Sequence, residues 1–309
     1  MRALERCLVC YNKRVKNIVF IVNPKSGKKR LDIPRFEQSI KRYFPEGRLL
    51  LTQGPSHATQ LARAAAQQSA QAVIAVGGDG TINEVAQGLV GTKTALGVIA
   101  RGSGNGFARE LGMLLPPEKA VERLTKLHPV LCDVGRANGE LFLNLAGVGI
   151  EAVIAWQFME QGKTGKRGMW PYFKMGVQTA FSYKPQCLCV TYDGKMTEQA
   201  PLTLVFANGR QYGSNFKIAP DASLTDGFLD MVTVKNGNKL KLLLAAPFFF
   251  TNKWRPFGLT DVSPVKHALI AKKGDIIYHI DGEPRKTQDK LEICIEPKSL
   301  YVLMEQENG

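Results

Sequence analysis

The first 110 residues repeat one unit three times: a short apolar run, a glycine-bearing loop and a segment with helical spacing. The apolar runs are Lys16–Val22, Ala72–Val76 and Leu96–Ile99. Apolar strands that alternate with helices are typical of a parallel sheet covered by helices. The sequence therefore predicts an α/β domain for the first third of the chain. In such domains ligands bind at the carboxyl ends of the strands, which is where the three loops lie.

Residue spacing and helix-end signals complete this domain. Leu49–Thr52 is a predicted short strand, and Ser56 is placed to cap the helix that follows it. We expect a helix that ends at Leu111 and further helices at Ile33–Tyr43, His57–Ser69, Ile82–Leu89 and Pro117–Leu127.

After about residue 130, short β-rich runs alternate with turn sequences such as Asp193-Gly194 and Asn236-Gly237. Two helical segments interrupt them, Ala152–Phe158 and Lys239–Phe249. We expect an α/β domain over 1–132 and a mostly antiparallel β domain over 133–296. The C-terminal segment 297–309 is a candidate to pack against the α/β domain. The predicted strands are Leu141–Leu145, Cys187–Tyr192, Leu202–Ala207, Leu229–Val234, Ile276–Ile280 and Leu291–Ile295.

The chain has 309 residues and a formal net charge of +14. This basic balance favours nucleic acid, an acidic membrane surface or polyphosphate as partners, without choosing among them. We expect no membrane-spanning helix and no secretory signal, since no apolar run has the required length. The six cysteines form no disulfide framework, which favours the cytoplasm. Cys7 and Cys10 form a single C-x-x-C, which alone is a weak zinc signal.

The strongest motif is Gly77-Gly78-Asp79-Gly80-Thr81, directly after a buried strand and before a helix. Glycines let the backbone approach phosphates, and free N–H groups at a helix start attract anions. A carboxylate there would repel phosphate unless a metal ion lay between them. Asp79 therefore indicates Mg²⁺ and a nucleotide, although a strand-to-helix turn with a capping aspartate accounts for the loop equally well.

Two further loops strengthen the nucleotide interpretation. Asn23-Pro24-Lys25-Ser26-Gly27 follows the first strand, and Gly102-Ser103-Gly104-Asn105-Gly106 follows the strand that ends at Ile99. Three such loops at neighbouring strand ends would make one phosphate-binding rim. The chain has no P-loop motif, and the third loop lacks the last glycine of the dinucleotide fingerprint. Arg101 stands two residues before Ser103, so the loop is no nucleophile elbow.

Taken in order, NPKSG, GGDGTINEV, GSGNGFARELG, DGFLD and DGEP resemble the diacylglycerol-kinase catalytic family, from about residue 16 to residue 296. This superfamily includes bacterial diacylglycerol and phosphatidylglycerol kinases, sphingosine kinases and ceramide kinases. GGDGT alone is shared with NAD kinases, whereas its combination with GSGN and a late DGEP is specific. The resemblance implies an ATP-dependent lipid kinase. It also implies an NAD-kinase-like α/β domain with a parallel sheet, a C-terminal β-sandwich domain, and ATP in the cleft between them.

The resemblance further implies which residues bind ATP and Mg²⁺. Asp226 resembles the family's structural Mg²⁺ ligand, assisted by the main-chain carbonyls of Ser223 and Phe228, although an ordinary turn before a strand would look similar. The residues implied for ATP are Asn23, Pro24, Lys25, Ser26, Gly27, Thr52, Gly77, Gly78, Asp79, Gly80, Thr81, Ile82, Asn83, Gly102, Ser103 and Asn105.

The catalytic base of this family is drawn from the motif that here is Asp281-Gly282-Glu283-Pro284. Asp281 and Glu283 are both candidates. Asp79 is a third, because the resemblance to sphingosine kinases implies the matching aspartate as base. Without the resemblance, Asp281-Gly282 is more often the signal of a hairpin turn. The expected chemistry is phosphoryl transfer, in which positioning, Mg²⁺ and cationic donors supply most of the catalysis.

Two positions depart from the family pattern. Gly106 stands where diacylglycerol kinases usually carry an aspartate of their Mg²⁺ network, which puts that network in doubt and tilts the substrate from diacylglycerol toward sphingoid bases. Arg101 stands where the family often has proline. It adds a cation that either contacts phosphate or faces solvent.

The segment Gly162–Lys174 combines basic and aromatic residues, a composition typical of membrane interfaces, although a solvated loop with buried aromatics fits as well. The expected partners are a membrane lipid substrate and an anionic membrane surface, which makes the protein peripherally membrane-associated. We expect no nucleic-acid binding, because the basic residues are dispersed and the aromatic residues form no stacking platform with them. The oligomeric state stays open, a homodimer included. So do an NAD kinase-like phosphotransferase and a non-catalytic family member that binds nucleotide or lipid.

Overall fold

A computed structural model describes residues 17–27, 29–162, 179, 182–212, 216–237 and 258–305. Within these residues the chain divides into two compact units, one formed by 17–132 with 298–305 and the other by 133–297. Three predicted features lie outside the described residues: the helix Lys239–Phe249, the Cys7–Cys10 motif, and all of the basic and aromatic segment beyond Gly162. None of the described helices is long and apolar enough to cross a bilayer.

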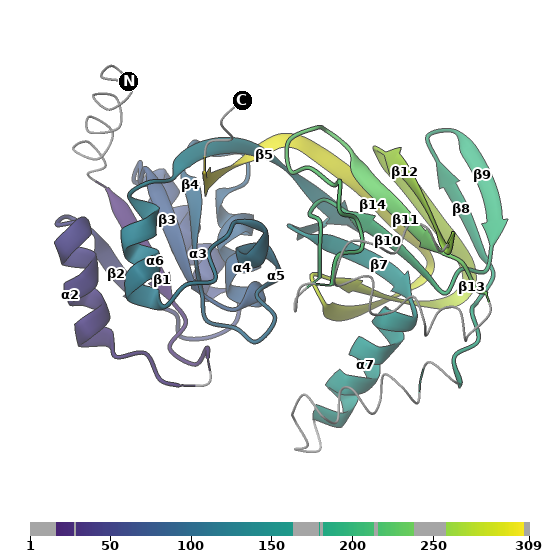
Figure 1. Cartoon of the computed structure of the whole chain (residues 1–309), viewed down its shortest axis with the longest axis horizontal. Helices are drawn as coiled ribbons and strands as arrows, with labels where there is room; N and C mark the ends of the chain where they lie inside the picture. Colours follow the sequence, from purple (N-terminus) through teal and green to yellow (C-terminus); the bar gives the residue numbers. More distant parts are fainter. Residues whose placement is uncertain are drawn as a thin grey trace. The chain divides into compact units, whose positions relative to one another are not determined.

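The first unit contains a parallel sheet in the order β2–β1–β3–β4 (Figure 1). All residues of β1 and β3 are buried, which explains why both strands are unbroken apolar runs. The last part of β14 joins this sheet through a parallel pairing of Val302 with Leu96 of β4. The strands are β1 (Ile18–Val22), β2 (Arg48–Leu51), β3 (Ala72–Gly77) and β4 (Ala95–Ala100).

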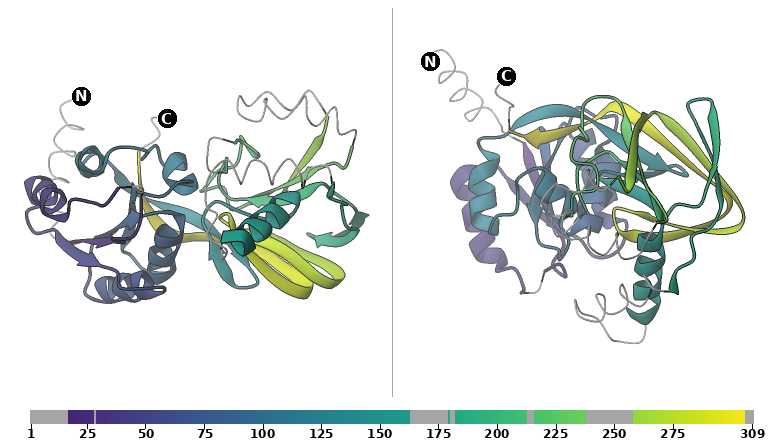
Figure 2. Two further views of the ribbon diagram at one scale, coloured as in Figure 1. Left: turned by 90° about the horizontal axis from the view of Figure 1, so that it is seen from below. Right: turned by 45° about the vertical axis from the view of Figure 1, so that its right-hand side comes forward.

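Helices lie on both faces of this sheet (Figure 2). On one face α2 packs against α6, and on the other α3 packs against α4. The approach of α3 to α4 requires Gly88, because a Cβ there would lie 2.6 Å from the Thr59 carbonyl oxygen. The helices are α2 (Ile33–Tyr43), α3 (His57–Gln67), α4 (Asp79–Leu89), α5 (Gly106–Glu110) and α6 (Pro117–Leu124).

Several helix ends differ from the prediction: α3 ends at Gln67 rather than Ser69, α5 at Glu110 rather than Leu111, and α6 at Leu124 rather than Leu127. Ser56 does not cap α3: it has a φ of 61° and its side chain makes no capping bond. The cap comes from α4 instead, since the Glu84 carboxylate accepts hydrogen bonds from the backbone N–H groups of Ser56 and Ala58 at 2.9 and 3.2 Å. Helix α4 begins at Asp79, three residues before the predicted Ile82, because Gly78 serves as its N-cap.

The second unit is mainly antiparallel, with the strand order β12–β11–β10–β7–β13–β14. Strand β8 pairs with β13 and β9, while β5 pairs with β14 and β6. Helix α7 (Ile150–Gly162) follows β7 directly (Figure 1). The strands are β5 (His128–Ala137), β6 (Glu140–Phe142), β7 (Leu145–Gly149), β8 (Leu188–Tyr192), β9 (Lys195–Gln199), β10 (Thr203–Ala207), β11 (Leu229–Val234), β12 (Thr260–Val265), β13 (His267–Ile280) and β14 (Glu283–Met304).

Strands β7 and β10 are buried on both faces. Ala146, Val148 and Phe206 belong to one apolar cluster, whereas their chain neighbours Leu145 and Val205 belong to another. Because successive side chains of a strand point to opposite faces, these two strands separate the two clusters. The core of the second unit therefore has two layers, and β7 and β10 lie between them.

Several strand predictions need correction. The predicted strand Leu141–Leu145 is two strands, because β6 ends at Phe142 and β7 begins at Leu145. The predicted Ile276–Ile280 and Leu291–Ile295 are parts of the much longer β13 and β14. Strands β5, β9 and β12 were not predicted, since their polar residues hide the apolar alternation.

Candidate functional site

Four chain segments at the carboxyl ends of β2, β1, β3 and β4 lie in one row, because these strands are parallel neighbours. We call this row the strand-end rim; it consists of Thr52, 23–27, 77–83 and 101–106. Backbone hydrogen bonds continue from the sheet into the rim. Asn23 N–H donates to the Val76 carbonyl at 3.0 Å, and Thr52 N–H donates to the Val22 carbonyl at 2.9 Å. The structure therefore brings the predicted ATP residues of the first unit together along one edge.

The side chain of Asn23 organises the first loop and ties it to α4. Its Nδ2 donates to Thr81 Oγ1 at 3.1 Å, and its Oδ1 accepts from the Lys25 backbone N–H at 3.0 Å. Ser26 Oγ donates to the Asn23 carbonyl at 2.8 Å. These contacts fold the loop back on itself and join it to the first turn of α4.

Asp79 joins the second loop to the third. Its Oδ2 accepts a hydrogen bond from the Asn105 backbone N–H at 2.8 Å. Burial raises the pKa of Asp79 above its ordinary value, and this outweighs the lowering by the N–H groups of Asn105, Gly106 and Phe107. The Asp79 carboxylate thus stabilises the start of α5, while Gly78 is the N-cap of α4.

Three glycines make this close packing possible. A Cβ on Gly102 would lie 2.7 Å from Gly78 Cα, and a Cβ on Gly77 would lie 2.5 Å from the Thr81 side chain. Asn105 closes the third loop, since its Oδ1 accepts from Gly102 N–H at 2.7 Å and its Nδ2 donates to the Gly102 carbonyl at 2.8 Å. The glycines of the rim therefore leave the backbone partly accessible where a phosphate would approach, beside the exposed residues Lys25 and Ser103.

Arg101 fastens the first loop to the end of β4. Its guanidinium Nη2 donates to the carbonyl oxygens of Ser26 and Lys29 at 3.2 and 2.6 Å. Gly27 adopts a φ of 91°, and a Cβ there would lie 3.0 Å from the guanidinium. Desolvation lowers the pKa of Arg101, but an arginine stays charged at neutral pH. This cation therefore connects two loops of the rim by hydrogen bonds.

In the second unit, Asp281 and Gly282 form the two-residue turn between β13 and β14, because Ile280 pairs with Glu283. Their φ values of 49° and 87° are the left-handed values that a type I′ turn requires. We call Asp281, Gly282 and Glu283 the acidic turn. The hairpin interpretation of this sequence is therefore correct, and it does not exclude a functional role.

The two carboxylates of the acidic turn have different surroundings. Asp281 Oδ2 accepts from Leu143 N–H at 2.9 Å, and its Oδ1 accepts from Asn144 and Leu145 N–H at 2.9 and 3.0 Å. These bonds interrupt the predicted strand between β6 and β7. The Glu283 side chain is 56% exposed and approaches Arg285 at 3.4 Å. Asp281 thus fixes the backbone, whereas Glu283 presents its carboxylate to solvent.

The predicted metal residues lie in one loop before β11. Asp226 Oδ1 accepts from Phe228 N–H at 3.0 Å, and the neighbouring Gly227 N–H donates to Asp133 Oδ2 at 2.7 Å. Burial and the charge of Asp226 together raise the pKa of Asp230, so two carboxylates lie close to each other. A cation would offset their repulsion.

No group of three His, Cys, Asp or Glu residues in the described ranges is arranged to hold a metal ion. The chemistry of the 223–228 loop nevertheless fits Mg²⁺. This ion commonly takes one or two carboxylates and completes its shell with water or phosphate oxygens.

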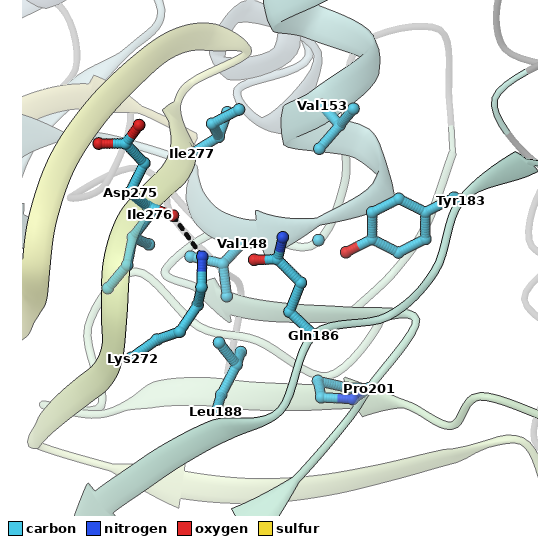
Figure 3. A pocket seen from close by; sticks show the side chains of 11 residues that line it. Val148, Val153, Tyr183, Gln186, Leu188, Pro201, Lys272, Asp275, Ile276 and Ile277 are labelled. Atoms are coloured by element: carbon cyan, nitrogen blue, oxygen red, sulfur yellow. Dashed lines mark hydrogen bonds between the residues drawn. The ribbon is translucent and has the colours of Figure 1, made fainter.

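A small pocket of about 60 Å³ lies beside β7 and the start of α7 (Figure 3). Its wall is mainly apolar, and Tyr183 and Gln186 add polar groups from the segment before β8. Lys272 Nζ donates to the Asp275 carbonyl at 2.6 Å at the opposite side. The apolar residues of the wall are Val148, Val153, Leu188, Pro201, Ile276 and Ile277.

A buried polar group near the acidic turn escaped the sequence analysis. His279 of β13 is 1% exposed and lies close to Glu151 of α7 and Tyr212. A single histidine in a strand gives no signal in the sequence, and Glu151 resembles any acidic residue of a helix's first turn. Only the folded chain brings these side chains together.

Two family models match the chain. Residues 17–137 match the diacylglycerol kinase catalytic domain, and residues 145–304 match the YegS C-terminal NAD kinase beta sandwich-like domain. The diacylglycerol kinase of Bacillus subtilis (strain 168) is 31% identical over 239 residues, which cover 75% of this chain and 78% of that protein. A probable lipid kinase YegS-like protein of Chromohalobacter salexigens is 32% identical over 277 residues, covering 85% of this chain and 86% of the relative.

Solved structures agree in fold. A putative diacylglycerol kinase from Bacillus anthracis str. Sterne matches with a TM-score of 0.76 and 23% identity, covering 94% of this chain and 95% of that one. An NAD kinase from Archaeoglobus fulgidus, solved in complex with ATP, matches with a TM-score of 0.51 and 14% identity, covering 94% of each chain. At these identities the likeness shows the fold alone. The predicted fold class, an NAD-kinase-like α/β domain followed by a β-sandwich domain, is confirmed.

Proposed function

Because this chain belongs to the family of diacylglycerol kinases and YegS-like lipid kinases, we propose that it transfers the γ-phosphate of ATP to a hydroxyl group of a membrane lipid. The observation that carries this proposal is the strand-end rim. Three glycine-bearing loops are tied into one edge by Asn23 with Thr81 and by Asp79 with Asn105. Backbone N–H groups at such an edge, next to the start of α4, suit a polyphosphate.

In this proposal the rim residues named from the sequence bind ATP, with Thr52 and Ser103 at its two ends. The structural Mg²⁺ would be held by Asp226 with the main-chain carbonyls of Ser223 and Phe228, and Mg²⁺ bound with ATP would neutralise phosphate charge. Asp79 serves the rim chiefly by ordering the third loop, because its carboxylate already accepts the N–H of Asn105.

Glu283 is the base we favour. The acceptor hydroxyl gives its proton to the Glu283 carboxylate as its oxygen forms a bond to the γ-phosphorus, while the bond from that phosphorus to the β,γ-bridging oxygen breaks and ADP leaves. Asp281 suits this role less, since both of its oxygens accept backbone hydrogen bonds. The exposed Glu283 carboxylate has no such engagement with the backbone among the described residues.

The acceptor we propose is a lipid, diacylglycerol or a sphingoid base first of all. The lipid acceptor rests on the family, because the pocket beside α7, at about 60 Å³, is far smaller than a lipid site. Gly106 supplies no carboxylate at the position where diacylglycerol kinases usually have one. An anionic membrane surface as the docking partner rests on the sequence alone.

The test is transfer of labelled phosphate from ATP with Mg²⁺ to a panel of lipids in mixed micelles. The panel holds diacylglycerol, monoacylglycerol, sphingosine, dihydrosphingosine, ceramide, phosphatidylglycerol and undecaprenol, and NAD is assayed beside them. Glu283→Gln is the matched control, because it separates the activity of this protein from that of a contaminating kinase. A labelled lipid with the wild type alone supports the proposal. Phosphorylation of NAD and of no lipid would replace it with the NAD kinase alternative, and ATP binding without any product would favour a non-catalytic protein.

A further inference from the structure

His279 lies directly beneath the acidic turn. Its Nδ1 accepts a hydrogen bond from the Gly282 backbone N–H at 3.4 Å. A ring nitrogen accepts a hydrogen bond only when it carries no proton. The neutral ring must therefore carry its proton on Nε2.

The other side of the ring faces two polar side chains. His279 Nε2 lies 3.8 Å from Glu151 Oε1 and 3.5 Å from Tyr212 Oη. The Tyr212 ring also packs against the imidazole, with a distance of 5.6 Å between the ring centroids. Gly147 leaves room for this arrangement, since a Cβ there would lie 3.0 Å from Glu151 Oε1 and 3.1 Å from His279 Nε2.

Both groups of this pair are deeply buried. The Glu151 side chain is 22% exposed, but its two oxygen atoms are buried. Burial raises the pKa of Glu151 to about 8 and lowers the pKa of His279 to about 4. At neutral pH the pair is thus an uncharged acid beside a neutral imidazole, because neither charge is solvated there.

The acidic turn is consequently held on two sides. Asp281 binds the backbone between β6 and β7, and Gly282 donates to His279. Glu283 is the next residue, so its backbone position depends on both contacts. A displacement of about 1 Å can slow a catalysed reaction by about 100-fold, so this fixation bears on turnover.

We propose that His279 is a positioning residue for the proposed phosphoryl transfer: it accepts the Gly282 N–H through Nδ1 and so fixes the turn that presents Glu283, while Glu151 and Tyr212 hold its ring by packing contact. This inference rests on the proposed function. It assigns a role to three residues that lie outside the kinase motifs.

The kinetic test compares three substitutions of His279 in the full chain. In His279→Asn the side-chain oxygen can take the place of Nδ1 and accept the Gly282 N–H. In His279→Gln the polar group reaches toward the Nε2 position, and His279→Leu supplies no acceptor. We expect kcat to fall by about 10- to 100-fold for Leu and Gln with the KM for ATP unchanged. For Asn we expect kcat to stay within about fivefold of the wild type.

A purely structural role would give a different pattern. It would lower the melting temperature of all three variants and leave kcat of the folded protein unchanged, and that result would overturn the proposal. Equal loss of kcat in Asn and Leu would overturn it too. If His279→Leu does not fold, Gln against Asn provides the same comparison. Failure of the proposed function is distinct, because the wild type itself would then phosphorylate no lipid.

A second measurement needs no activity. The chain has four histidines, so ¹⁵N-labelled histidine gives few ring signals, and the spectrum of His279→Asn identifies that of His279. We expect a ring that is protonated on Nε2 and not on Nδ1, and that does not titrate between pH 5.5 and 7, below the range in which Glu151 ionises. Among the described residues, the titratable groups that face it are Glu151 of α7 and Tyr212 of the segment after β10. A proton on Nδ1, or titration near the ordinary histidine pKa of about 6.5, would overturn the proposal.

Discussion

An aspartate orders the backbone both in the strand-end rim of the first unit and in the acidic turn of the second unit. The two aspartates differ in how far along the chain their hydrogen-bond partners lie. Asp79 accepts the N–H of Asn105, which lies 26 residues away at the end of a neighbouring strand. Asp281 accepts three N–H groups from residues 136 to 138 positions away. The rim therefore follows from local motifs and strand order, whereas the acidic turn depends on long-range packing. In both places the aspartate orders the backbone, and only in the turn does a second, exposed carboxylate stand beside it.

The sharpest way to break this comparison is to remove, one at a time, the charges of the two carboxylates in the acidic turn. We expect Glu283→Gln to lower kcat by about 100- to 10,000-fold with little change in stability, because Gln cannot take the acceptor's proton. Asp281→Asn places an amide N–H₂ against backbone N–H groups, so we expect it to cost about 1–3 kcal/mol of stability. Steady-state kinetics and thermal unfolding of both variants separate the two roles. A larger kcat loss in a fully stable Asp281→Asn protein would reverse the assignment.

A second prediction uses the pH dependence of stability. Glu151 has a pKa of about 8 in the folded chain against an ordinary value of 4.5, so the folded state holds a proton that the unfolded state has lost between these values. Stability must therefore fall as pH rises through this window. His279 has a folded pKa of about 4 against 6.5, and it contributes the opposite slope between pH 4 and 6.5.

Above pH 6.5 the loss of stability caused by Glu151 is no longer offset by His279. We expect the free energy of unfolding to fall by about 2 kcal/mol between pH 6.5 and 8, since one pKa unit corresponds to about 1.4 kcal/mol. Chemical denaturation at several pH values measures this slope, and Glu151→Gln should remove it. A slope that persists in Glu151→Gln would show that another group titrates. The rim, where Asp79 is partly stabilised by N–H groups, should contribute less in this range.

The two regions also differ in how far the sequence predicted them. Fold class, family and the strand Leu229–Val234 were predicted correctly, because apolar runs, glycines and turn residues are local signals. The role of Ser56 was wrong, since Glu84 of another helix supplies the cap. The strand through Leu143 was wrong because the Asp281 carboxylate takes its N–H groups. Both errors arise from contacts between distant segments, which propensity and periodicity do not register.

Contacts between distant segments also explain why part of the site could not be predicted. Glycine motifs at the ends of parallel strands can be located from the sequence, and strand order then brings them together. The neighbours of the acidic turn cannot be found this way: Glu151, Tyr212 and His279 meet only after β7, β10 and β13 have paired. The assignment of ATP, Mg²⁺ and the base to particular residues stays a prediction.

The smallest expected effect concerns Arg101 and tests whether its side chain orders the backbone of the rim. Arg101 donates to the carbonyls of Ser26 and Lys29 and faces Gly27, so its role should be to hold the first loop. Arg101→Met keeps the length of the side chain and removes the donors. Loss of one or two such bonds is worth about 1 kcal/mol, which corresponds to roughly a fivefold rise in the KM for ATP with kcat nearly unchanged.

Arg101→Lys, which keeps the charge but not the planar fork, is the matched control and should recover only part of the affinity. If Lys restores ATP affinity fully, the charge matters and Arg101 contacts phosphate. If neither variant changes the KM, the first loop is ordered by Asn23 alone, and the rim needs no tie from β4.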